Sequence, residues 1–63
     1  MSASIRIKKG KYQVVDVTYN NKGVSTINVI SEWIPIPQAV KDMQRMPANI
    51  DFVAGTQYEH YFK

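Results

Sequence analysis

Four basic side chains and one aromatic ring lie close together near the start of this 63-residue chain. They are Arg6, Lys8, Lys9, Lys11 and Tyr12. Guanidinium and ammonium groups bind phosphates, and an aromatic ring can stack on a base or a sugar, so this group has the chemistry to contact DNA or RNA. The same basic residues also keep an exposed strand edge soluble, which is the simpler interpretation of a cluster of this size.

The charge of the chain is concentrated in the same region. Residues 1–23 hold five basic residues and one acidic residue, whereas residues 24–63 hold three basic and four acidic residues, and the whole chain has a net charge of +3. A positive field at one end of a protein steers anionic partners, nucleic acids included.

Groups suited to catalysis are few. Cysteine is absent, His60 is the only histidine, and the five carboxylates lack the paired spacing of general acid and base catalysis. The three glycines are far apart, so no phosphate-binding glycine loop is predicted. We therefore expect no catalytic residues, no metal site and no cofactor.

A second aromatic group is concentrated in the later part of the chain. Its members, together with the histidine, are Trp33, Tyr58, His60, Tyr61 and Phe62. In an extended tail the adjacent Tyr61 and Phe62 would point to opposite faces, and a terminal strand of this kind can pair with another chain. We expect these residues at a protein interface, in a homodimer or with a host protein, with core filling as the alternative.

A small antiparallel sheet is expected to position the basic group. Residues 4–8 and 11–19 have the alternation and the β-branched residues of strands, and residues 20–23 supply a hairpin turn before a third strand over 24–33. In the second strand the odd-numbered residues Val15, Val17 and Tyr19 are the expected core face, because the even-numbered set contains Asp16.

One helix, at about residues 36–46, is expected to cover this three-stranded meander. Its apolar residues recur at helical spacing: Ile36, Ala39, Val40, Met43 and Met46. Pro35 or Pro37 suits a first turn, and Pro47 ends the helix.

The remainder of the chain is expected to return to the sheet. Residues 49–54 have the composition of a strand, and residues 57–62 either complete a hairpin or continue one strand past a bulge at Gly55. The predicted fold is therefore α+β, with a meander, one covering helix and a carboxy-terminal strand or hairpin at the sheet edge.

The length of the chain indicates a single domain over residues 1–63. A chain of this size buries only about 60% of its unfolded surface, so stabilisation by a partner is expected. No apolar run approaches the roughly 20 residues that span a bilayer, and the amino terminus lacks the pattern of a secretory signal. We expect a soluble cytoplasmic protein without membrane contact.

Two stretches resemble known groups of proteins. Residues 4–23, which begin Ser-Ile-Arg-Ile-Lys-Lys-Gly-Lys-Tyr, resemble the arm-type DNA-binding domain of phage integrases. That resemblance implies a three-stranded sheet that packs on one helix and enters the major groove, although residues 25–30 here contain no basic side chain. Residues 33–62 are similar in layout to small uncharacterised bacterial and phage proteins of strand-strand-helix-strand order.

Taken together, these features favour a non-enzymatic small binding protein encoded by a phage or another mobile element. It would act as an inhibitor or regulator, through a protein interface or a ligand site between subunits. The alternative is a sheet-based DNA- or RNA-binding module that uses the basic amino-terminal hairpin.

Overall fold

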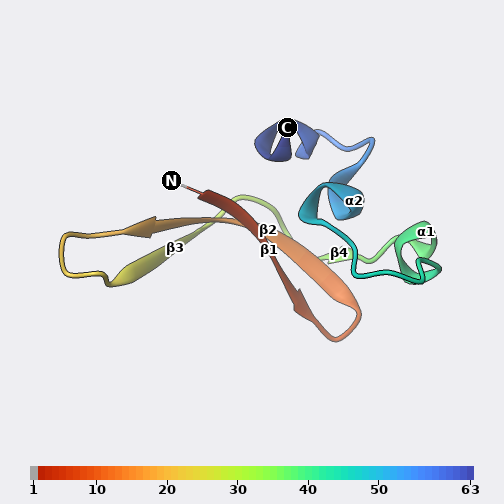
Figure 1. Ribbon diagram of the computed structural model, residues 1–63, viewed down its shortest axis with the longest axis horizontal. Coiled ribbons are helices and arrows are strands. Elements are labelled where there is room, and N and C mark those ends of the chain that lie inside the picture. Colours follow the sequence, from red (N-terminus) through yellow and green to blue (C-terminus); the bar gives the residue numbers. More distant parts are fainter. Residues whose placement is uncertain (1) are drawn as a thin grey trace.

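An elongated antiparallel sheet forms one side of the molecule, and short helical segments lie along part of it (Figure 1). The structure is a computed structural model that describes residues 2–63. The strands are β1 (Ser2–Lys8), β2 (Lys11–Tyr19), β3 (Ser25–Val29) and β4 (Ile34–Pro35). The helical segments are α1 (Gln38–Lys41), α2 (Asn49–Val53) and the 3₁₀ helix η1 (Glu59–Phe62).

The predicted three-stranded meander is confirmed, with β2 at its centre. β1 pairs antiparallel with residues 11–17 of β2, and β3 pairs antiparallel with residues 15–19 on the opposite edge. The short β4 pairs with the first two residues of β2, so β3 and β4 share one edge.

Between β3 and β4 the Ser31 side chain, and not a backbone carbonyl, accepts a hydrogen bond from β2. The amides of Ile30 and Ser31 both donate to the Val14 carbonyl, at 2.9 and 3.1 Å. The Val14 amide in turn donates to the Ser31 hydroxyl at 2.9 Å, and that hydroxyl donates to the Glu32 carbonyl. Ser31 therefore keeps buried backbone groups paired where the chain bulges away from β2.

The core lies on one face of the sheet and is small. Its buried residues are Tyr12, Val14, Val40, Phe52 and Val53. The prediction that Val15, Val17 and Tyr19 face the core is wrong for the core cluster, because Tyr12 and Val14 belong to it instead. Of the predicted residues only Val15 is buried, at 3% exposure. The helical segments cover only part of this face, so Asp16 occupies it while remaining half-exposed.

The single covering helix over about 36–46 is not confirmed. Helix α1 spans only Gln38–Lys41, Val40 is its only buried residue, and Met46 is 89% exposed. A short helix depends on packing for its stability. The sheet offers no surface to the second half of the predicted apolar stripe, so the helix stops after one turn.

The strand predicted at residues 49–54 is wrong, because these residues form α2. The Asp51 carboxylate accepts a hydrogen bond from the Ala48 amide at 2.7 Å and a bond from the Arg45 guanidinium at 3.1 Å. A carboxylate at this position satisfies an unpaired amide of the first turn and interacts favourably with the helix dipole. The helix places Phe52 and Val53 in the core.

The predicted final strand or hairpin is also wrong. Ala54 (φ −54°, ψ 128°) ends α2, and Gly55, with a φ of +80°, lies in a tight turn that the Thr56 amide closes by donating to the Val53 carbonyl at 2.9 Å, so Gly55 forms neither a hairpin turn nor a bulge between strands. Residues 59–62 form η1, and Tyr58 and Phe62 pack against the core. In the described part of the chain, no helix is long and apolar enough to cross a membrane.

Candidate nucleic-acid interface

The β1–β2 turn places a lysine in an unfavourable backbone conformation. Lys8 pairs with Lys11, which leaves Lys9 and Gly10 as a two-residue loop. Both loop residues have positive φ, at 51° for Lys9 and 74° for Gly10, as a type I′ turn requires. Asparagine, aspartate or glycine is the usual choice at the first position, so the sequence retains a cation there at some cost in stability.

Three ammonium groups are concentrated at this turn without a matching acid. Lys8 and Lys11 are cross-strand neighbours, and like charges directly opposite each other destabilise an antiparallel pair. In the described residues the only ion pair joins Arg45 to Asp51, which is in another part of the chain. An anionic partner would relieve this repulsion.

Arg6 is held against Trp33 beside these lysines. Its guanidinium carbon lies 5.2 Å from the centre of the Trp33 ring, which is cation–π distance. Its Nε donates to the side-chain oxygen of the buried Gln13 at 2.7 Å. Within residues 2–63 the two Nη groups have no hydrogen-bond partner, so an ordered guanidinium presents free donors beside an aromatic ring.

Trp33 and the three lysines line one open hollow of about 410 Å³. This volume is within the range of roughly 300–1,000 Å³ found for small-ligand sites. We call these four residues together with Arg6 the basic hairpin site (Arg6, Lys8, Lys9, Lys11 and Trp33). The site combines several positive charges with an indole, which suits an anion that carries planar rings.

The structure brings together four of the five residues predicted to contact nucleic acid, and excludes Tyr12. Tyr12 is 1% exposed, and its ring packs against Phe52 with the centroids 5.6 Å apart. Burial is the main reason that the pKa of Tyr12 is raised, with smaller contributions from Tyr58 and Glu32. Tyr12 is therefore a core residue at the base of the hairpin.

Trp33 takes the place that Tyr12 was expected to fill. Sequence reasoning assigned it to the carboxy-terminal aromatic group, but it lies with the basic residues. The proximity depends on the Ser31 bulge, which carries the chain past Val14 and returns it alongside the start of β2 as β4. The sequence analysis did not predict the strand Ile34–Pro35, and the pairing of that strand with the start of β2 is what places Trp33 beside the hairpin.

The remaining residues of the predicted protein interface lie at the carboxy terminus. Tyr58 and Phe62 pack on the core, and the Tyr58 hydroxyl is 3.5 Å from a Glu32 carboxylate oxygen. The rings of His60 and Tyr61 are 4.2 Å apart, and Tyr61 remains partly exposed. No extended edge is available at these residues for pairing with another chain, because they form η1.

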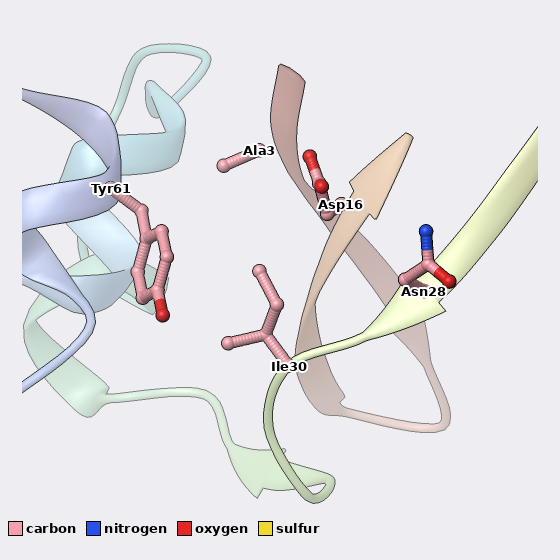
Figure 2. A pocket seen from close by; sticks show the side chains of 5 residues that line it. All are labelled: Ala3, Asp16, Asn28, Ile30 and Tyr61. Carbon is pink, nitrogen blue, oxygen red and sulfur yellow. The ribbon is translucent and has the colours of Figure 1, made fainter. Parts of the chain in front are cut away.

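A second hollow, of about 430 Å³, lies between η1 and the sheet (Figure 2). Tyr61 faces Ile30 across it, and Ala3, Asp16 and Asn28 line the sheet side. Asp16 is its only charged residue, and among the described residues no group of histidines, cysteines or carboxylates could hold a metal ion. The hollow lacks the concentration of charge that distinguishes the basic hairpin site.

Comparison of the chain with family models, curated proteins and solved structures finds no match.

Proposed function

We propose that this protein binds single-stranded nucleic acid through the basic hairpin site. The observation that carries the proposal is the group of uncompensated cations around Trp33, with the Arg6 guanidinium over the indole at cation–π distance. Proteins that bind single strands combine a positively charged groove with aromatic rings on which bases stack.

Each part of the site has a separate role in this proposal. Lys8, Lys9 and Lys11 neutralise successive phosphates, and binding releases the counterions that those phosphates had condensed. Arg6 offers its two Nη groups to one phosphate in a fork that Gln13 and Trp33 keep ordered. A base stacks on the accessible part of the Trp33 ring.

A single strand fits this site better than a duplex. The basic residues lie on β1, on β2 and in the turn between them, whereas β3 contains no charged residue. A sheet that enters a duplex groove contacts the phosphates of both backbones, and such contacts position the protein on the duplex. The cations here are confined to one end of the sheet, where they can follow one backbone.

The competing proposal, an inhibitor or regulator that acts through the carboxy-terminal aromatic residues, has less support. It relied on an unpaired terminal strand, and residues 59–62 are helical. A phage or mobile-element origin stays a prediction.

The test uses Trp33, which is the only tryptophan in the chain and therefore an intrinsic reporter. We expect its fluorescence to be quenched as an oligonucleotide of about 15 nucleotides is added. With up to four neutralised phosphates, the logarithm of affinity should fall against the logarithm of salt concentration with a slope of about −3.

Two further ligands test whether binding is specific for single-stranded nucleic acid. Heparin tests for general polyanion binding, because it supplies negative charge without bases that can stack. A duplex of the same sequence tests the choice of a single strand. Equal affinity for all three ligands, with no quenching by the single strand, would show that the site does not recognise nucleic acid.

A further inference from the structure

The β2–β3 hairpin carries an exposed apolar surface away from the basic hairpin site. The hairpin extends to the left in Figure 1, away from all three helical segments. Tyr19 is 70% exposed, Val29 58% and Ile27 51%, and every residue of β3 is exposed. We call Tyr19, Ile27, Val29 and the half-buried Val17 the apolar strip.

Strand register places the apolar strip on one face of the hairpin. Val15 pairs with Val29, Val17 with Ile27 and Tyr19 with Ser25, and cross-strand partners point to the same face. The alternate pairs, Asp16 with Asn28 and Thr18 with Thr26, put polar side chains on the other face. The hairpin therefore has one uncharged, mainly apolar face and one polar face.

The outer edge of β3 is also open. Ile30 donates to Val14, and Asn20 donates to Val24, so the even-numbered residues of β3 direct their backbone groups toward β2. The N–H and C=O groups of Ser25, Ile27 and Val29 consequently point away from the sheet. No proline, charge or bulge within β3 protects this edge, although natural edge strands usually have such protection.

The molecule exposes more surface than its mass requires. Its accessible area is 4660 Å², whereas a folded monomer of this mass should expose about 4,100 Å². Its radius of gyration is 12.5 Å, against about 10.6 Å for a compact chain of this length. The excess of roughly 560 Å² is about two thirds of the 800 Å² or so that each partner buries in a standard interface.

We infer that the apolar strip is the interface with a second copy of this chain. A two-fold interface sets a surface patch against itself, so charges within the patch would repel their own copies. The strip has no charged residue, although the chain carries a net charge of +3, and it is therefore suited to self-association. The second copy packs its apolar strip on the first and covers Tyr19, Ile27 and Val29.

The test is the mass of the protein in solution without nucleic acid, measured by sedimentation equilibrium. We expect twice the 7.2 kDa of one chain at micromolar concentrations. Ile27→Lys should give the single-chain mass, whereas Thr26→Lys, its neighbour on the polar face, should leave the dimer intact. A wild-type monomer at all concentrations up to the millimolar range, or equal effects of the two variants, overturns the inference.

A second measurement does not depend on any substitution. In a mixture of isotopically labelled and unlabelled wild-type chains, we expect intermolecular NMR contacts between the Tyr19 ring and the methyl groups of Ile27 or Val29. Intermolecular contacts confined to η1 would instead assign the interface to the carboxy terminus. Neither measurement involves nucleic acid, so failure here leaves the proposed function standing, and failure of nucleic-acid binding leaves this inference standing.

Discussion

The two hairpins of the sheet share β2 and differ in almost every other respect. The β1–β2 hairpin has a two-residue turn, three lysines and an arginine ordered against Trp33. The β2–β3 hairpin has a longer turn over residues 20–24 and exposes an uncharged apolar face. At the β1–β2 end the lysines repel one another because no anion compensates their charge, and at the β2–β3 end apolar side chains are exposed to water. The same strand therefore presents two surfaces that call for chemically different partners.

Charge reversal in the β1–β2 hairpin should have the largest effect, and this effect should be confined to nucleic-acid binding. Lys8→Glu with Lys11→Glu replaces two cations of the basic hairpin site with anions, and we expect oligonucleotide affinity to fall by about 100-fold or more at low salt. The mass in solution should not change. Trp33 quenching in the titration measures the loss.

The matched control for that variant is Lys22→Glu with Lys41→Glu. It changes the net charge equally, at two exposed lysines outside the site. A similar loss of affinity in both variants would mean that net charge, not the arrangement around Trp33, determines binding.

Removing the Ser31 hydroxyl should weaken both hairpins together. Ser31→Ala leaves the buried Val14 amide without its acceptor, which should lower the free energy of unfolding by about 2 kcal/mol. Urea denaturation measures the change, and Ser25→Ala at the exposed start of β3 is the control, with an expected change below about 0.5 kcal/mol. Equal changes in the two variants would remove the role assigned to Ser31.

A substitution at Lys9 should change stability and nucleic-acid affinity in opposite directions. Lys9→Asn replaces a lysine at positive φ with a residue that tolerates this conformation, so we expect the free energy of unfolding to rise by about 1 kcal/mol. Oligonucleotide affinity should fall severalfold because one phosphate contact is lost. A variant that is more stable and binds as tightly as the wild type would exclude Lys9 from the site.

Tyr12 should have the smallest effect at neutral pH and a distinct effect in alkali. Its pKa is raised in the folded state above the ordinary value of 10.0, so the folded chain holds the phenol proton more tightly than the unfolded chain. Stability from this group is complete below pH 10 and is lost as the pH rises toward the folded pKa.

Tyr12→Phe removes the titrating phenol, so we expect the wild type to lose more stability above pH 10 than the variant in parallel urea titrations. Nucleic-acid binding at neutral pH should be unchanged. Weakened binding by Tyr12→Phe would return Tyr12 to the site from which its burial excludes it.

Sequence reasoning succeeded where the signals were local. Alternation in β1 and β2 and the turn residues at 20–23 predicted the meander, and the spacing from Arg6 to Lys11 predicted most of the basic hairpin site. It failed where structure depends on which surface is available. The apolar period of residues 36–46 met too little sheet to form a helix of that length, and the Asp51 carboxylate favoured α2 over a strand.

The face of β2 and the position of Trp33 were missed for a related reason. The charge of Asp16 argues against the even-numbered face as the core, but this residue stays half-exposed because the helical segments cover only part of that face. Trp33 reaches Arg6 through the hydrogen bond from the Val14 amide to the Ser31 hydroxyl, 17 positions away, and through the pairing of β4 with the start of β2.

The sharing of β2 also links the two binding events thermodynamically. A chain with so small a core is expected to be marginally stable, and any partner that binds only the folded form shifts the folding equilibrium toward it. An oligonucleotide at one hairpin would then tighten apparent self-association at the other, by no more than it raises the folded population. Amide hydrogen exchange at residues 15–17, which are paired on both edges, would slow with either partner, by an amount set by that partner's concentration relative to its dissociation constant.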